Sequence, residues 1–239
     1  MRMRETLSQA VYNAGRDIKL EADQSLNADL VRDLQTLLTM PAFSEETGWT
    51  GGIPSEADLY WVIDPLDGSY NYWRGQPAFC IAVAVCCGRT PLFGAIYDIA
   101  HNEIYLGGEN SPASCNGHPI TVSGARGVDQ SCLMTGLPVG GHFDSTSLSR
   151  FAHGLGRWKK VRMIGSAAMS LAYVASGRAD FYHEDGIFWW DVAAGLAILK
   201  AARGDFRVSG APDADSPLHV TAGSPDLLRA TVANEECLI

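Results

Sequence analysis

The amino-acid sequence predicts a mixed α/β fold. Two observations carry this prediction: the first half of the chain is rich in strand patterns, and the second half alternates strands with helices. The chain has 239 residues, 46% of them hydrophobic and 19% charged. This composition is typical of a globular protein with a substantial core. A polar stretch near 124–130 divides the chain into two expected halves, 1–125 and 126–239.

The first half is expected to combine helix with an antiparallel sheet. Apolar residues recur at helical spacing from residue 5 to about 39, with a break after Gly15, which predicts two helices. Apolar, β-branched runs then predict strands at 59–64, 78–88, 91–99 and 102–108, and a further strand at 119–124. The short turn after 91–99 predicts a hairpin with 102–108.

The second half is expected to form a mixed sheet covered by helices. Its strand patterns fall at 131–136, 159–165, 179–183, 204–210 and 218–223. Its helical patterns fall at 166–177, 190–204 and 224–233. The helix at 190–204 has an acidic residue at its start and a glycine at its end, both common helix boundaries.

Charge and composition disfavour several classes of partner. The net charge is −9, whereas binding to a nucleic-acid backbone needs clustered Lys and Arg. No apolar run approaches the ~18 residues of a membrane span. The N-terminus lacks the apolar segment of a signal peptide, and the six cysteines show no zinc-binding spacing. We therefore expect a cytoplasmic protein that binds neither nucleic acid nor membrane.

A strand that ends in two carboxylates is the main candidate for chemistry. In the stretch WVIDPLDGSYNY (61–72), Asp64 and Asp67 stand three residues apart on a turn. Asp-Pro and Asp-Gly are also ordinary turn signals. However, two such carboxylates can converge on one cation, and the carbonyl of Leu66 can point the same way. The N–H groups of Gly68 and Ser69 would then lie where a helix begins, which favours a bound anion.

Two further acidic places strengthen this interpretation. Glu45 and Glu46 lie in a loop, and Asp191 opens a helix. Taken singly, a solvated pair and a helix cap explain them. Taken with Asp64 and Asp67, they supply the oxygen ligands that Mg²⁺ prefers.

Five segments, in the same order along the chain, resemble the inositol monophosphatase family. Residues 64–72 are similar to its signature Asp-Pro-Ile-Asp-Gly-Thr-x-Asn-Phe, and 190–195 to its Trp-Asp-x-Ala-Ala-Gly. Residues 44–46 stand where the family has Gly-Glu-Glu, 165–168 match its Gly-Ser-Ala stretch, and 116–117 its Asn-Gly. The resemblance runs from about residue 20 to the end of the chain.

The resemblance implies Mg²⁺ ions held by four carboxylates and one backbone carbonyl, from Glu45, Asp64, Leu66, Asp67 and Asp191. Glu45 and Ser69 would orient the attacking water, so the implied catalytic set is Glu45, Asp64, Asp67, Ser69 and Asp191. Glu46 would interact with the metal ligands without binding an ion itself. Two ions are implied and a third is left open, because IKLEAD (18–23) follows the N-terminal segment without most of the family's usual loop.

The resemblance also implies a substrate side, formed by Gly68, Ser69, Gly165, Ser166, Ala167 and Glu184. It implies a layered α-β-α-β-α sandwich and a homodimer. The implied activity is Mg²⁺-dependent hydrolysis of a small phosphorylated polyol or sugar. Four alternatives stay open: a 3′(2′),5′-bisphosphate nucleotidase, a fructose-1,6-bisphosphatase, a histidinol-phosphate phosphatase, and a regulatory dimer on a phosphatase fold. A bisphosphate substrate would implicate Lys159, Lys160 or Arg162.

Overall fold

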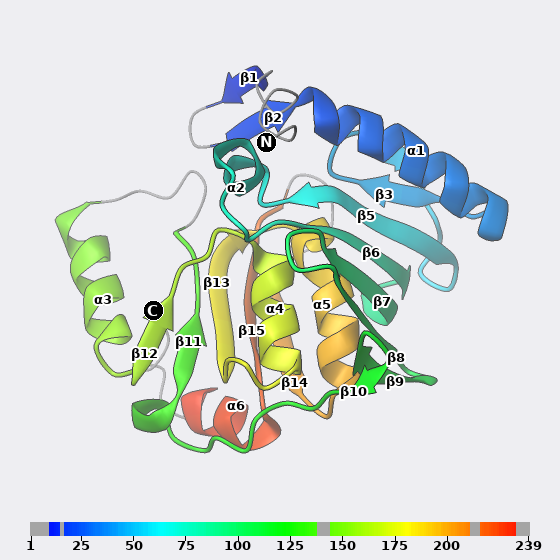
Figure 1. Ribbon diagram of the computed structural model, residues 1–239. Coiled ribbons are helices and arrows are strands. Elements are labelled where there is room, and N and C mark those ends of the chain that lie inside the picture. Colours follow the sequence, from blue (N-terminus) through cyan, green and yellow to red (C-terminus); the bar gives the residue numbers. More distant parts are fainter. Residues whose placement is uncertain (1–9, 15–16, 138–143, 211–215, 233–239) are drawn as a thin grey trace.

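Two large sheets with a helical layer between them form the body of the protein (Figure 1). The computed structural model describes residues 10–14, 17–137, 144–210 and 216–232. Helices α4 (Ala167–Ala175) and α5 (Trp189–Ala201) lie between the sheets and pack on both. On the outer faces lie α1 (Glu21–Leu37) on the larger sheet and α3 (Ser145–Leu155) and α6 (Pro225–Val232) on the smaller one. The predicted α/β class and its layered α-β-α-β-α order are confirmed.

The larger sheet has eight strands in the order β10-β9-β8-β7-β6-β5-β3-β4. All neighbours are antiparallel except β3 and β5, which run parallel. Its strands are β3 (Ala42–Ser44), β4 (Gly48–Thr50), β5 (Leu59–Asp67), β6 (Cys80–Cys87), β7 (Thr90–Asp98), β8 (Glu103–Gly108), β9 (Ser111–Cys115) and β10 (His118–Pro119). The predicted hairpin of the strands now labelled β7 and β8 is present.

The smaller sheet has five strands in the order β12-β11-β13-β15-β14. It is mixed: β11 runs parallel to β12 and β13, and β15 is antiparallel to β13 and β14. Its strands are β11 (Cys132–Met134), β12 (Lys160–Arg162), β13 (Phe181–Ile187), β14 (Asp205–Ser209) and β15 (Leu218–Gly223). The C-terminal strand and helix predictions therefore hold, with ends shifted by a few residues.

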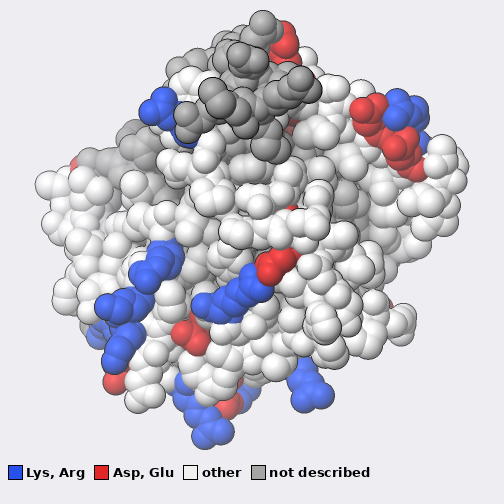
Figure 2. All heavy atoms as spheres, viewed as in Figure 1, with Lys and Arg blue, Asp and Glu red and all other residues white. Residues whose placement is uncertain are grey.

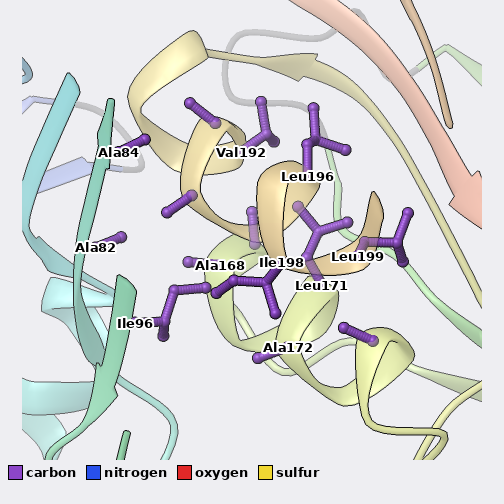
Figure 3. Close-up of a cluster of buried hydrophobic side chains, with 14 of the residues drawn as sticks. Ala82, Ala84, Ile96, Ala168, Leu171, Ala172, Val192, Leu196, Ile198 and Leu199 are labelled. Atoms are coloured by element: carbon purple, nitrogen blue, oxygen red, sulfur yellow. The ribbon is translucent and has the colours of Figure 1, made fainter. Parts of the chain in front are cut away.

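Small side chains let the central helices approach the larger sheet closely. Figure 3 shows Ala82 and Ala84 facing the helical layer, in which Leu171 and Leu196 lie. On β7, a side chain at Gly94 would place its Cβ 2.1 Å from the carbonyl oxygen of Ala194. The sheet and α5 therefore meet backbone to backbone, which brings the first turn of α5 up to the end of β5.

Two local predictions are wrong. Residues 10–14 and 17–20 were expected to be helical, but they form β1 (Ala10–Ala14) and β2 (Asp17–Leu20), paired antiparallel. Val11 and Tyr12 favour strands, and pairing across the hairpin overrides a weak helical period. The rest of the predicted first helix, residues 5–9 and 15–16, lies outside the described residues.

The strand expected at 119–124 is also wrong beyond Pro119. The N–H of Val122 bonds to the carbonyl of Ala202, so the chain leaves the sheet edge and runs past the end of α5. Two kinds of element were missed: the helix α3, which begins with Asp144 as its cap, and the very short strands β3, β4 and β9. Within the described part of the chain, no helix is both long and apolar enough to cross a membrane.

Candidate active site

A bulge in β5 puts Asp64 and Asp67 on the same face of the sheet. Residues three apart on a regular strand point to opposite faces. Here Asp64 pairs with Ala82 and Asp67 with Cys80, so β5 uses one residue more than β6 between the two pairs. Such an extra residue reverses the alternation. The bulge contains Pro65, a residue that sheets accept mainly at edges and bulges.

Asp191 completes a group of three carboxylates. It lies in the first turn of α5, where its Oδ2 accepts a hydrogen bond of 2.8 Å from the N–H of Phe188. One oxygen from each of Asp64, Asp67 and Asp191 lies within 4.8 Å of the others. The N-cap of α5 is Phe188 and not Asp191, which is the third residue of the helix. The Asp191 carboxylate still accepts from the N–H of the cap residue and also belongs to the group.

The N-terminus of α4 holds Asp67 in place. The Oδ2 of Asp67 accepts 2.6 Å and 2.7 Å hydrogen bonds from the Ser166 hydroxyl and the Ala168 N–H. Ser166 is the N-cap of α4 and also accepts from the N–H of Met169. The positive end of the helix and two donors thus fix one oxygen of Asp67. Whether Ser166 also touches substrate remains a prediction.

The electrostatics of these three carboxylates favour binding of a cation. Burial raises the pKa of Asp64 well above its usual range, and the neighbouring carboxylates Glu45, Asp67 and Asp191 raise that pKa further. Burial raises the pKa of Asp67 to about 6, although its hydrogen bonds oppose this. Burial likewise raises the pKa of Asp191, and Asp67 and Glu45 add to the rise. These carboxylates are costly to ionise without a positive charge among them.

An unsatisfied oxygen supports the same conclusion. The Oδ1 of Asp64 accepts from the N–H of Leu66 at 2.9 Å. Its Oδ2 is buried and has no hydrogen-bond partner among the described residues. A buried acceptor without a donor is rare. An all-oxygen set with one acceptor left over fits a hard divalent cation.

A cavity of about 390 Å³ opens over these carboxylates. Nearly every predicted site residue lines it: Glu45, Asp64, Leu66, Asp67, Gly68, Ser69, Gly165, Ser166, Ala167, Glu184 and Asp191. Glu46 does not line it, and its N–H bonds to the Ser44 hydroxyl. Of the described residues around the cavity, none is Lys, Arg or His.

The predicted helix start follows the two aspartates directly. Helix α2 (Ser69–Arg74) begins after Gly68, whose φ is +87°. A Cβ at Gly68 would come within 2.7 Å of the Ala78 carbonyl oxygen, so both conformation and space require glycine. The Ser69 hydroxyl donates to the Leu66 carbonyl at 2.8 Å and lies 3.4 Å from Asp23 Oδ1.

Asp23 lies next to the candidate site, and sequence reasoning assigned it no role there. It is only 2% exposed and reaches Ser69 from the first turn of α1. An acidic residue in a first helical turn is common, so no local pattern distinguishes Asp23 from Glu21. Its burial beside Ser69 is the feature that distinguishes it.

Glu184, on β13, lines the cavity, and its contact with substrate stays a prediction. Burial raises the pKa of Glu184 to about 7. The Tyr182 hydroxyl donates to its Oε2 at 3.1 Å, and a Cβ at Gly136 would lie 2.1 Å from its Oε1. The Asn71 amide donates to the carbonyls of Ala78 and Ile164, each at 2.7 Å, and so joins α2 to the segments that lead into β6 and α4.

The basic residues weighed for a second phosphate lie elsewhere. Lys159, Lys160 and Arg162 are on or beside β12 and do not line the cavity. Lys and Arg gather on the face drawn in Figure 2, at the lower left, where Figure 1 places β12. This edge strand is short and charged, which is a common protection against edge-to-edge pairing.

The comparisons with known proteins agree with this fold. The model of the inositol monophosphatase family matches residues 3–231, and the chain belongs to that family. It is 37% identical over 179 residues to the Nus factor SuhB of Xylella fastidiosa, covering 70% of this chain but only 62% of that protein. It is 35% identical over 196 residues to Nus factor SuhB of Escherichia coli K12, covering 80% and 72%.

A solved structure of the family shares the architecture. The inositol monophosphatase of Anabaena (Nostoc) sp. PCC 7120 superposes with a TM-score of 0.75 and 33% sequence identity. The likeness covers 89% of this chain and 86% of that one. The predicted family is therefore confirmed. The family supports phosphatase chemistry, a metal-dependent site and a small phosphorylated substrate.

Proposed function

We propose that the protein is a Mg²⁺-dependent phosphomonoesterase acting on a small phosphorylated polyol or sugar. One observation carries the proposal: the buried carboxylates of Asp64, Asp67 and Asp191 converge within 4.8 Å, and Asp64 Oδ2 has no donor among the described residues. Asp64, Asp67 and Asp191, with Glu45 and the carbonyl of Leu66, would hold two or three Mg²⁺ ions. A homodimer in the cytoplasm is part of the proposal.

Mg²⁺, when bound, supplies the charge that lets a phosphate dianion approach the carboxylates and acidifies a water molecule. The chain's own groups then have distinct tasks. Glu45 and the hydroxyl of Ser69 would orient that water, and Asp23 would hold the Ser69 hydroxyl in place. The N–H groups of Gly68 and Ser69, at the start of α2, would donate to the phosphate oxygens.

The groups around Glu184 would select the alcohol part of the substrate. Glu184 lines the cavity and can accept hydrogen bonds from hydroxyl groups. The absence of Lys, Arg and His among the described lining residues argues against a second phosphate, as in an adenosine bisphosphate or fructose 1,6-bisphosphate. Histidinol phosphate carries one phosphate and stays an alternative. The exclusion of nucleic acid rests on net charge alone and stays a prediction.

The direct test is release of inorganic phosphate, with Mg²⁺ and with a chelator. The compounds are inositol phosphates, sugar phosphates, adenosine bisphosphate, fructose 1,6-bisphosphate and histidinol phosphate. We expect Mg²⁺-dependent release from a monophosphate and its loss in Asp67→Asn. The matched control is Asp205→Asn, since Asp205 does not line the cavity and pairs with Lys200 on the surface. Full turnover in Asp67→Asn would contradict the assignment.

A second candidate is a regulatory role, favoured by the name Nus factor that two relatives carry. This role and the phosphatase activity separate in one experiment. A strain in which Asp67→Asn replaces the wild-type protein would keep its phenotype if regulation alone matters. It would behave like a deletion strain if the phosphatase reaction matters.

A further inference from the structure

A buried thiol lies beside the acidic site, on the neighbouring strand of the larger sheet. Cys80 is the first residue of β6 and is fully buried. In the antiparallel pairing of β5 with β6 it stands directly opposite Asp67, so the two side chains share one face of the sheet. Figure 3 shows the next two residues on that face, Ala82 and Ala84, turned toward the helical layer. The thiol of Cys80 therefore faces the same helices as Asp67.

The sulfur contacts both partners of the hydrogen bond that holds Asp67. Cys80 Sγ lies 3.8 Å from Asp67 Oδ2 and 4.0 Å from the hydroxyl oxygen of Ser166. The same Oδ2 accepts from the Ser166 hydroxyl and from the N–H of Ala168, which both belong to the start of α4. The thiol is thus a third group around this oxygen, and it comes from the sheet.

The surroundings of Cys80 keep its thiol protonated. Burial raises the pKa of this thiol well above its usual value, and the carboxylates of Asp67 and Asp64 raise it further. Asp98 stands across from Cys80 on β7 and adds to the rise, but both of its oxygens contact His101. A neutral thiol is a weak hydrogen-bond donor. The carboxylate oxygen in contact with it, Asp67 Oδ2, is its acceptor.

We propose that Cys80 is a positioning residue of the metal site, whose S–H group helps to hold Asp67 Oδ2 so that Oδ1 is offered to the cation. Mg²⁺ demands near-octahedral geometry, so a carboxylate that cannot turn suits it. Groups that hold a metal ligand in this way affect affinity without touching the ion. This inference rests on the proposed metal-dependent function and adds a residue to it. Sequence reasoning treats a cysteine in an apolar strand as a small core residue.

The test removes the same sulfur at two places on one strand. Cys80→Ala deletes the donor. Cys86→Ala is the matched control, because Cys86 is equally buried on the same face of β6, about 20 Å further along the strand. Both variants lose one buried sulfur from the same core cluster, so their loss of stability should be similar. A difference between them in metal binding therefore reports on the contact with Asp67.

Metal binding is measured by isothermal titration calorimetry of Mg²⁺ into the metal-free protein. The Kd should rise about fivefold in Cys80→Ala, less than is usual for such partners because a thiol is a weak donor. It should stay unchanged in Cys86→Ala. An unchanged Kd in Cys80→Ala, or an equal rise in both variants, would overturn the proposal.

An infrared measurement separates this proposal from the phosphatase function, since it needs neither metal nor turnover. The S–H stretching band of a thiol moves to lower frequency when the thiol donates a hydrogen bond. The spectrum of each protein at pH 8 minus that of its Cys80→Ala derivative isolates the Cys80 band. This band should move to higher frequency in Asp67→Asn, because an amide oxygen is a weaker acceptor than a carboxylate. The band isolated with Cys86→Ala should stay in place.

The two failures are then distinguishable. If Mg²⁺ does not bind the wild type and no compound releases phosphate, the proposed function fails, while the infrared shift still supports the bond from Cys80 to Asp67. A Cys80 band that keeps its frequency in Asp67→Asn would overturn the positioning role, whatever the activity of the wild type.

Discussion

The hydroxyl of Ser166 donates to the carboxylate of Asp67 at 2.6 Å, across 99 residues of sequence. The same hydroxyl accepts the N–H of Met169 and so begins α4. One side chain therefore starts a helix of the second half and orients a candidate metal ligand of the first. Groups that orient metal ligands in this way usually matter for both affinity and activity.

Replacing Ser166 should damage stability and catalysis together. In Ser166→Ala, loss of the helix cap should lower the free energy of unfolding by about 1 kcal/mol. Without the hydrogen bond from Ser166, the Asp67 carboxylate is less well oriented. Mg²⁺ affinity or kcat/KM should therefore fall by about 10- to 100-fold. Ser166→Thr should restore both. Thermal unfolding and Mg²⁺ titration of activity measure the two effects.

The control for that variant is Asp144→Ala. Asp144 caps α3 by accepting from the N–H of Ser147 at 2.8 Å, and it is exposed. Asp144→Ala should lower the free energy of unfolding by a similar amount and leave the Mg²⁺ dependence of activity unchanged. Equal losses of activity in both variants would show that Ser166 acts only through general stability.

Removing the Asp64 charge should stabilise the metal-free protein. Asp64 is buried, and the carboxylates around it disfavour its ionised form. In Asp64→Asn the side-chain oxygen can still accept from the N–H of Leu66. The electrostatic repulsion from the neighbouring carboxylates disappears, and no buried charge at position 64 is left without a cation. We expect a higher Tm in EDTA. We also expect loss of the Tm increase that Mg²⁺ gives the wild type, which corresponds to a stabilisation of about 2.7 kcal/mol at 100 times Kd. Asp205→Asn should retain that increase, and a lower Tm of Asp64→Asn in EDTA would contradict the prediction.

Metal-free stability should fall as pH rises from 5 to 8. Burial raises the pKa of Asp67 from 3.8 to about 6 and that of Glu184 from 4.5 to about 7. The folded protein therefore retains protons that the unfolded chain releases, so deprotonation favours the unfolded chain. For these two groups, the loss begins above the unfolded pKa values and is complete above pH 7.

Thermal unfolding in EDTA across this pH range tests the sign. With saturating Mg²⁺ the trend should reverse, because metal binding requires ionised carboxylates. Glu184→Gln should flatten the upper part of the metal-free curve. A Tm that is constant or rising between pH 5 and 8 in EDTA would refute the assignment of these raised pKa values.

A single methyl group at Gly136 should move Glu184. Its Cβ would lie 2.1 Å from Glu184 Oε1, closer than any real contact. Gly136→Ala should raise KM by about tenfold, comparable to the loss of one hydrogen bond to a charged group, with only a small change in Tm. Gly124→Ala meets no atom within 4 Å and is the control. An unchanged KM in Gly136→Ala would show that Glu184 does not contact substrate.

The sequence predicted which residues lie together better than it predicted the connections that hold them. Asp64, Asp67 and Asp191 stood out because carboxylates at the ends of apolar segments are unusual together. The bulge that turns Asp64 and Asp67 to one face has only Pro65 as a local signal. The bond from Ser166 to Asp67 has none, because it joins positions far apart in the chain.

The errors have a common physical origin. Residues 10–14 were predicted as helix from a few apolar spacings, whereas pairing with 17–20 decides their structure. Val122 was predicted to lie in a strand, but its N–H donates to the carbonyl of Ala202 at the end of α5 instead. Asp23 was passed over because its importance comes from burial beside Ser69. In each case a contact with another segment outweighs the local pattern.

The chain order of the site has a consequence for biosynthesis. Asp64 and Asp67 leave the ribosome long before the donors that fix them, since Ser166 and Ala168 follow Asp67 by 99 and 101 residues. Asp191 follows later still. During translation, the strands of the larger sheet therefore carry Asp64 and Asp67 before the groups that orient Asp67 have been synthesised. A nascent chain stalled before residue 166 should lack the cation site, and the ion should bind only once α5 has emerged.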